Sequence, residues 1–157
     1  MTAARARLEE LVGEISALIG ADLALDPDGE CQLETDLGEE ALLSPAQDAD
    51  MIVVTVPLVE LPEKDREALL IETLVVNSEL ALTGTARIAI AMPEGMFVLR
   101  HGVDVAEATA TGLLALADRM IALGAEISQH LVSGRHVADE HGVTDRAATG
   151  VLPGSFA

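Results

Sequence analysis

Histidine and cysteine are the side chains in this sequence that could bind a metal ion or act in nucleophilic catalysis. A zinc site needs such ligands at close and regular spacing. Of the four histidines, only His136 and His141 lie close together, and a separation of five residues does not place two ligands on one helical face. His101 and His130 are isolated, and no carboxylate or thiol at ligand spacing completes a site. We therefore expect solvated histidines and no metal site.

The other chemical signals are weaker. Cys31 lies among acidic residues, which raise the pKa of a thiol, so a buried structural cysteine is favoured over a nucleophile. Asp26-Pro27-Asp28-Gly29 matches the start of a calcium-binding EF-hand loop, but further ligands are missing, and these residue types favour a β-turn. No serine lies in a nucleophile elbow, and there is no Walker loop or GxGxxG motif. The sequence thus predicts a binding protein without a cofactor rather than an enzyme.

The chain is strongly acidic, with 27 Asp and Glu against 9 Lys and Arg in 157 residues and a formal charge of −18. This charge has the wrong sign for binding the phosphates of nucleic acids or an anionic membrane surface. From Gly20 to Asp50 there are ten acids and no base, which favours a solvated face over an electrostatic docking surface. We therefore expect no nucleic-acid partner.

The N-terminal stretch and the cysteine content predict a cytoplasmic protein. Acidic residues interrupt the apolar stretch that ends at Gly20, so it lacks a signal-peptide core. No run of the sequence approaches the roughly 20 apolar residues of a membrane span. Cys31 is alone, so no internal disulfide is possible, as is typical of reducing compartments. We expect no membrane insertion.

The first part of the chain predicts one helix followed by strands. Leu8, Leu11, Val12, Ile15, Leu18 and Ile19 repeat at helical spacing, and Gly20 can end that helix. Leu23–Asp26 and Cys31–Asp36 flank a turn and predict a short hairpin. Leu37–Asp50 predicts a loop with a possible short strand. The β-branched run Met51–Val56 predicts a central strand that ends at Pro57.

The second part predicts two helices around a second hairpin. Leu61–Gly84 predicts a helix with Pro62 in its first turn, and Ala86–Met92 with Met96–His101 predicts the hairpin. Asp104 and Glu107 resemble a capping box for a third helix that runs to about Val132. The glycine-rich segment after it, residues 133–157, predicts a mobile tail.

These elements follow the order α-β-β-β-α-β-β-α. That order predicts an α+β fold in which helices pack on an antiparallel sheet. A chain of this length forms one domain, for which we expect residues 1–132.

The Leu61–Gly84 helix has more apolar surface than one packing face needs. Wound as a helix, it carries a broad arc of Leu70, Ile71, Leu74 and Val75 and a narrower arc of Leu69, Val76 and Leu80. One arc covers the sheet of the same chain. The other requires either the third helix or a second subunit.

In order, spacing and acidity these segments resemble the CesT-like (Tir chaperone) family, the class I chaperones of type III secretion. The resemblance covers about Leu8 to Leu131 and rests on the first helix, on LALDPDGECQLETD, on MIVVTV and on the LPEKDREALLIETLVVNSELALTGTARIAIAMPEGMFVLRHGV segment with the helix after it. It implies an acidic homodimer without ATPase activity, which binds the N-terminal segment of a secreted effector in extended form and keeps it competent for export. The alternative is a regulatory adaptor of the same fold that sequesters a cytosolic protein.

The resemblance also implies where such a protein makes its contacts. Subunits of the family pair largely through the second helix and the strand beside it, which would place at the dimer interface Leu69, Val76, Leu80, Ile88 and Ile90. Effector grooves lie over the first helix and the sheet, which makes candidates by position of Leu11, Val12, Leu33, Val53, Ala89, Ala91 and Phe97.

Overall fold

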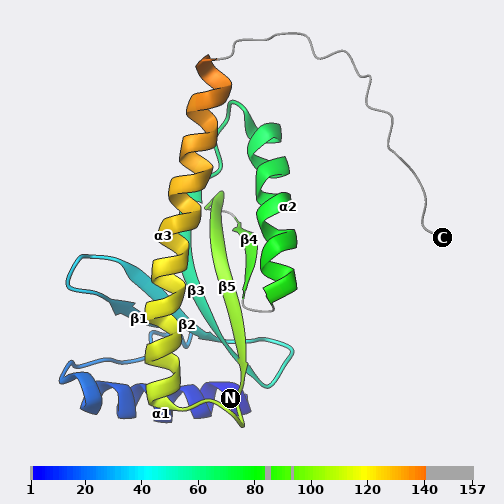
Figure 1. Cartoon of the computed structure of the whole chain (residues 1–157). Coiled ribbons are helices and arrows are strands. Elements are labelled where there is room, and N and C mark those ends of the chain that lie inside the picture. The colour runs from blue at the N-terminus through cyan, green and yellow to red at the C-terminus, as the bar shows by residue number, and fades with distance from the viewer. Residues whose placement is uncertain (1, 84–85, 93, 141–157) are drawn as a thin grey trace.

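A computed structural model describes residues 2–83, 86–92 and 94–140, and in this part of the chain three helices pack on one five-stranded sheet (Figure 1). The order of elements confirms the predicted α+β arrangement. The helices are α1 (Ala3–Ile19), α2 (Arg66–Thr83) and α3 (Ala110–Glu140). The strands are β1 (Cys31–Glu34), β2 (Glu40–Pro45), β3 (Met51–Glu60), β4 (Arg87–Ala91) and β5 (Met96–Asp104).

The sheet has the strand order β1-β2-β3-β5-β4, and every neighbouring pair is antiparallel. The predicted central strand is confirmed, because β3 lies in the middle and pairs on both sides. It does not end at Pro57 but continues to Glu60, with a shift of register against β5 between these two residues. Proline cannot donate to the ladder, and such an irregularity accommodates it.

The first predicted hairpin is wrong in its partner strand. Leu23–Asp26 is not a strand, and the Asp26–Glu30 turn instead closes on itself: Gly29 N donates to Asp26 O (3.0 Å) and Glu30 N to Asp26 Oδ1 (2.8 Å). Strand β1 pairs with β2, so that Cys31 lies opposite Leu43. The possible strand within Leu37–Asp50 is therefore the true partner of β1.

Local sequence explains where α1 begins and ends. The Thr2 hydroxyl accepts a hydrogen bond from Arg5 N, and Gly20 closes the helix in a left-handed conformation (φ 70°) with its N–H bonded to Ser16 O. The face between these ends buries Ala4, Leu8, Leu11, Val12 and Ile15. This confirms the predicted amphipathic helix as far as Ile15, whereas Leu18 and Ile19 of the predicted stripe are 60% and 49% exposed.

The other two helices differ from prediction at their ends. Helix α2 begins at Arg66 and not at Pro62, because Asp65 adopts a left-handed φ of 57° immediately before it. Helix α3 is capped by Thr109, whose hydroxyl accepts from Gly112 N (3.1 Å), whereas Asp104 lies at the end of β5. The predicted capping box is therefore wrong.

Helix α3 continues past Val132 to Glu140, so the start of the predicted tail is helical. The rest of that tail, residues 141–157, lies outside the described residues.

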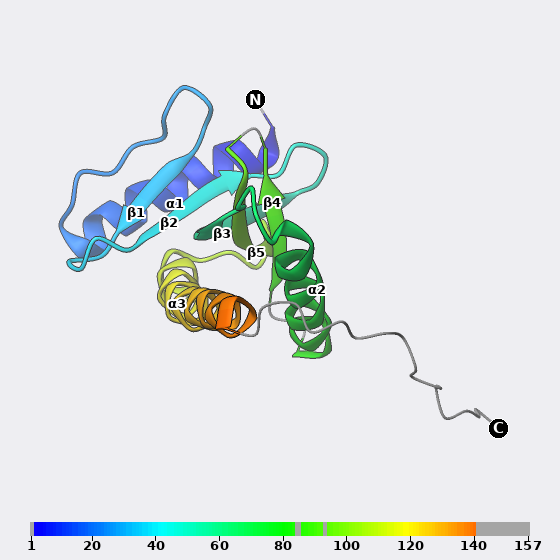
Figure 2. The ribbon, with the colours of Figure 1, turned by 90° about the horizontal axis from the view of Figure 1, so that it is seen from above.

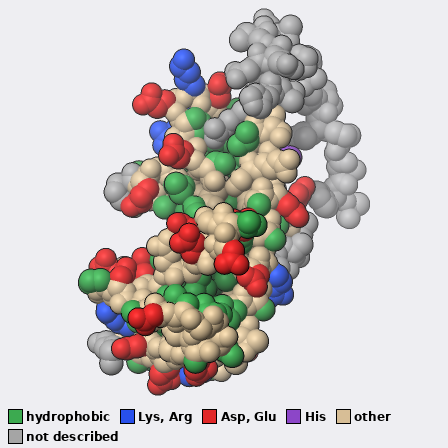
Figure 3. Space-filling model, turned by 90° about the vertical axis from the view of Figure 1, so that its left-hand side faces the viewer, with side chains coloured by type: hydrophobic (Ala, Val, Ile, Leu, Met, Phe, Trp, Pro, Cys, Tyr) green, Lys and Arg blue, Asp and Glu red, His purple; other side chains and the backbone are tan. Residues whose placement is uncertain are grey.

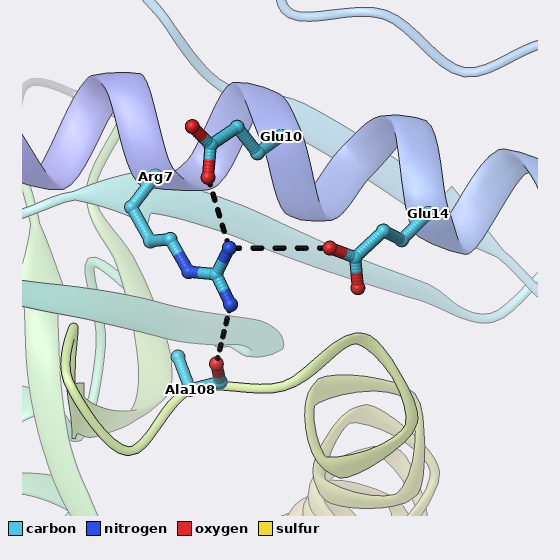
Figure 4. Close-up of polar contacts among 4 residues, drawn as sticks. All are labelled: Arg7, Glu10, Glu14 and Ala108. Atoms are coloured by element: carbon cyan, nitrogen blue, oxygen red, sulfur yellow. Dashed lines mark hydrogen bonds and ion pairs between the residues drawn. The ribbon is translucent and has the colours of Figure 1, made fainter.

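Helices α1 and α3 cover the same face of the sheet and cross near its lower end, as Figures 1 and 2 show. An arginine fixes this crossing (Figure 4): Arg7 on α1 bonds Glu10 (2.9 Å) and donates to the carbonyl oxygen of Ala108 (3.3 Å), just before α3. Above the crossing, Gly124 lets α3 approach β3 closely, since a Cβ built there would lie 3.0 Å from Val56 Cγ1. The core is the layer between these helices and the sheet.

Candidate functional site

The groups singled out for chemistry do not gather into a site. His130 bonds Glu72 across α3 and α2 (2.6 Å), and His101 lies on β5, where burial and then Arg119 lower its pKa. Within the described ranges, no three His, Cys, Asp or Glu side chains lie close enough together to hold a metal ion. His141 is outside these ranges, and the side chain of His136 is not described.

Cys31 is buried, with 1% of its surface exposed, as predicted for a structural cysteine. Burial raises the pKa of its thiol, and Asp26 adds to that shift. The predicted acidic contribution is therefore present but second in size. A protonated, inaccessible thiol is a poor nucleophile.

Among the residues that the structure describes, no helix lies over one face of the sheet. Residues directly opposite each other in antiparallel strands share a face, so the register traces a row across all five strands on this uncovered face. That row consists of Gln32, Leu42, Thr55, Arg100 and Arg87. The core-facing residues Leu43 and Val54 point to the opposite face and are fully buried.

Three of the predicted effector-binding residues lie on the uncovered face, where they are partly exposed. These are Val53, Ala89 and Ala91. Val53 is flanked on β2 by Ser44, and Ala89 lies opposite Val98 of β5. Small side chains at these positions allow another chain to approach the strands closely.

The other four predicted effector-binding residues are buried in the core of this chain. Leu11, Val12, Leu33 and Phe97 are between 0% and 7% exposed. Leu33 and Phe97 face the helices, because their strand parity is opposite to that of the uncovered face. These side chains are not accessible to another protein in this structure.

Leu42, Thr55 and Met96 also belong to the uncovered face and were not identified from the sequence. Leu42 was missed because its strand contains Ser44 and Pro45 and predicts a loop. Thr55 is the single polar side chain in the run Met51–Val56, and this is the sequence signal that could have identified the face on which it lies.

Helix α2 packs against the chain through its narrower arc. Leu69 and Leu80 are buried, and half-buried Val76 lines with Ile127 of α3 a shallow hollow of about 190 Å³ between the two helices. Thr73, also buried, donates its hydroxyl to Leu69 O (2.7 Å). The sequence left open which partner this arc meets, and the structure shows α3 and β4 of the same chain.

Three of the four residues in the broader arc of α2 face outward, whereas Leu70 is half-buried and packs against the core. Ile71, Leu74 and Val75 are 56%, 65% and 52% exposed, which is unusual for three large apolar side chains on one helix. Of the two strand residues predicted at a dimer interface, Ile88 is buried and Ile90 is 38% exposed. An outward apolar cluster of this kind is typical of a protein interface.

Asn77 of α2 closes the outer edge of the sheet. Its side-chain amide donates to Ile88 O (2.9 Å) and accepts from Ile88 N (2.7 Å), so it binds both backbone groups that Ile88 presents at the free edge of β4. An edge strand sealed in this way is protected from pairing with another chain at that position.

Acidic side chains are more frequent than Lys and Arg on the side of the molecule that carries β1 and β2 (Figure 3). Glu34 and Glu40 lie opposite each other there. Burial raises the pKa of Glu30, and Asp26 and Asp28 add to that shift while Arg100 opposes it.

None of the helices in the described part of the chain is both long enough and apolar enough to cross a bilayer.

Comparison with protein families gives one match, in which the sequence profile of the Tir chaperone protein (CesT) family covers residues 9–127. A search of curated protein sequences gave no match.

Solved structures share the fold. A chain of the ExsC–ExsE complex superimposes with a TM-score of 0.67 at 16% identity, covering 83% of this chain and 97% of that one. A chain of the HopA1–SchA chaperone–effector complex superimposes with a TM-score of 0.65 at 12% identity, covering 82% of this chain and 98% of that one. A chain of the heterodimeric ExoU–SpcU complex from the type III secretion system of Pseudomonas aeruginosa superimposes with a TM-score of 0.54 at 19% identity, covering 81% of this chain and 96% of that one.

Proposed function

Because the chain belongs to the Tir chaperone protein (CesT) family, we propose that it is an ATP-independent chaperone for an effector of type III secretion. It acts in the cytoplasm, where it holds the N-terminal region of the effector in an extended form that is competent for export. The observation that carries this proposal is the uncovered sheet face, on which partly exposed Leu42, Val53 and Ala89 lie without a covering helix. Family membership favours this function over the regulatory adaptor.

Binding in this way requires no covalent bond to be made or broken. An extended segment that lies on the uncovered face buries alternate side chains against Leu42, Val53 and the small residues of β4. Since Asn77 occupies the edge of β4 at Ile88, main-chain pairing with a bound segment is directed to the opposite edge, at β1. Each buried methylene contributes about 0.8 kcal/mol, so a long path of small contacts gives useful affinity.

The same proposal includes a homodimer that pairs through the broader arc of α2. Ile71, Leu74 and Val75 together form an exposed apolar stripe, and burying it against a second copy removes it from water. Leu69, Leu80 and Ile88 already pack within one chain, so we assign the subunit contact to the outward stripe and not to them. Ile90, which is 38% exposed, remains in this assignment.

Co-expression with effectors encoded beside this gene tests the function. We expect a stable complex in which limited proteolysis maps the bound region to the effector N-terminus. Val53→Asp places a charge on the uncovered face and should abolish the complex, whereas Leu37→Asp, on an 86% exposed loop residue, should not. Circular dichroism and sedimentation establish that each variant is folded and dimeric.

Ala89→Asp provides a second test on a different strand of the same face. Complex formation that survives both face variants would refute the assigned surface. Failure to bind any of these effectors, with a folded regulatory protein bound instead, would favour the adaptor.

A further inference from the structure

Two arginines lie side by side on the uncovered face, and within the described part of the chain neither of them forms an ion pair. Arg87 of β4 and Arg100 of β5 are directly opposite each other in the register, and both are exposed. Like charges directly opposite on adjacent strands destabilise a sheet. Their presence is therefore not explained by the stability of the fold.

The contacts of these arginines leave most of their N–H donors without a partner. Arg100 acts through space on Glu30, where it opposes the upward shift of that pKa, but no hydrogen bond or ion pair joins the two side chains. Arg87 Nη1 donates to the carbonyl oxygen of Ala86 (2.7 Å), a neutral acceptor next to it in the chain. Among the described residues the ion pairs join Arg7 to Glu10 and Glu14 and His130 to Glu72, and neither Arg87 nor Arg100 takes part in one. Each guanidinium has five N–H donors, so most of them remain free for a ligand.

The surroundings of the pair limit what that ligand is. Thr55 continues the row beyond Arg100, and Val98 with Ala89 forms the adjacent row on the same face. Val98 is only 7% exposed, so the apolar contact next to the pair comes from half-buried Ala89, and a chain whose carboxylate reaches the pair passes over that small side chain. The opposite end of the face carries Glu34 and Glu40, which repel an acid there.

From this charge pattern we infer that Arg87 and Arg100 together bind the carboxylate of an Asp or Glu in the extended effector segment, and so select its sequence and fix its position. The inference rests on the proposed function and deepens it. Two guanidiniums on one carboxylate form charge-assisted hydrogen bonds, which are about twice as strong as neutral ones. A strongly acidic chaperone thus recognises an acidic residue at one defined place.

Synthetic peptides that tile the N-terminal regions of the neighbouring effectors provide the probe, with fluorescence anisotropy on the full chain as the measurement. In a bound peptide, replacing the critical Asp or Glu by Asn or Gln should weaken binding about tenfold, the lower end of the range for charged hydrogen bonds. This difference should shrink as salt is raised. The R87Q/R100Q variant should bind both peptides equally and as weakly as the wild type binds the neutral one.

Two further variants make the test specific. E34Q/E40Q changes two charges at the other end of the same face and should leave the tenfold preference intact. R87E/R100E should bind a peptide with Lys at the critical position better than the original acidic peptide.

The failures are distinguishable. If wild-type protein binds peptides but no acidic residue in them matters, the inference is overturned and the proposed function stands. If no peptide binds, both fall. If R87Q/R100Q sediments as a monomer, the arginines serve a second copy of the chain, which also overturns the inference.

Discussion

The outward stripe of α2 gives the sharpest quantitative prediction, through the substitution Leu74→Ser. Complete burial of a leucine side chain is worth about 1.5–3 kcal/mol. Leu74 is 65% exposed in the single chain, so an interface can still contribute about 1–2 kcal/mol from each copy. Two-fold symmetry doubles this to about 2–4 kcal/mol, and at 1.4 kcal/mol per factor of ten the dimer should weaken about 30- to 700-fold.

Sedimentation velocity over a range of concentrations measures this dissociation constant. Leu18→Ser is the matched control, since Leu18 is also a helical leucine and is 60% exposed, but it lies on α1. It should leave the dissociation constant unchanged. Because neither leucine is buried within one chain, the monomer of each variant, measured below the dissociation constant of its dimer, should unfold within about 0.5 kcal/mol of the wild-type monomer.

A substitution in the narrower, buried arc of α2 should instead change the stability of the fold. Leu69→Ala should lower the free energy of unfolding by about 2–5 kcal/mol because Leu69 is 4% exposed. An unchanged dimer in Leu74→Ser, or a monomer in Leu18→Ser, would refute the assignment of the stripe.

Three further predictions concern stability, and urea or thermal unfolding measures each of them. Gly20→Ala should lower the free energy of unfolding by about 1–2 kcal/mol, because φ is 70° at this residue, where α1 ends. Gly13→Ala, inside the same helix and with no atom near an added Cβ, should raise it by about 0.5–1 kcal/mol. Equal effects would contradict the role of the left-handed cap. Burial lowers the pKa of His101 below its value of about 6.5 in the unfolded chain, so the unfolded state takes up protons first and stability should fall as pH drops below about 6.5. His101→Gln should make that loss smaller, and an unchanged slope would argue against it. Asn77→Ala should cost about 1–3 kcal/mol because both backbone groups of Ile88 lose their partner, and a change below about 0.5 kcal/mol would show that water replaces the amide.

Sequence periodicity predicts the elements whose burial has a simple geometry. The run Ile52–Val56 is β-branched because β3 is flanked by strands on both sides, and the stripe from Leu8 to Ile15 has helical spacing because α1 has one wet and one dry side. The β4–β5 hairpin is also predictable from its sequence, as two apolar runs separated by a turn.

Strand β2 is not predictable in the same way. Glu40–Pro45 contains an acid, a serine and a proline, which all disfavour strands. It is a strand because β1 and β3 pair with it on both sides. Ser44 lies opposite Val53, on the uncovered face of the sheet. Pairing between distant segments thus overrides local preference.

The two arcs of α2 are visible in the sequence, but their orientation is not. An amphipathic pattern identifies the inward face only where water covers the outward one. Here the arc with more apolar side chains points outward, while the narrower one packs against α3 and places Asn77 at the edge of β4. Of the four buried candidates for effector binding, Leu33 and Phe97 lie on strands, where position along the strand does not reveal the face, and Leu11 and Val12 belong to the stripe of α1 that packs into the core.

The fold separates the surfaces that a dimeric chaperone needs. Helices α1 and α3 occupy one face of the sheet, and Asn77 blocks the edge of β4, so a second copy that meets α2 cannot extend the sheet at Ile88. In the proposed mode of binding the effector lies on the other face of the sheet. There Arg100 is on β5, next to the central strand β3, and Arg87 is on β4, one strand further out. Since Leu74 lies on the helix and Arg100 on the strands, dimerisation and selection of the effector should respond to different substitutions. A double variant of Leu74→Ser and Arg100→Gln should therefore lose as much dimer affinity as Leu74→Ser alone and as much effector affinity as the two single variants together. A loss of effector affinity much larger than that sum would mean that one subunit completes the binding site of the other.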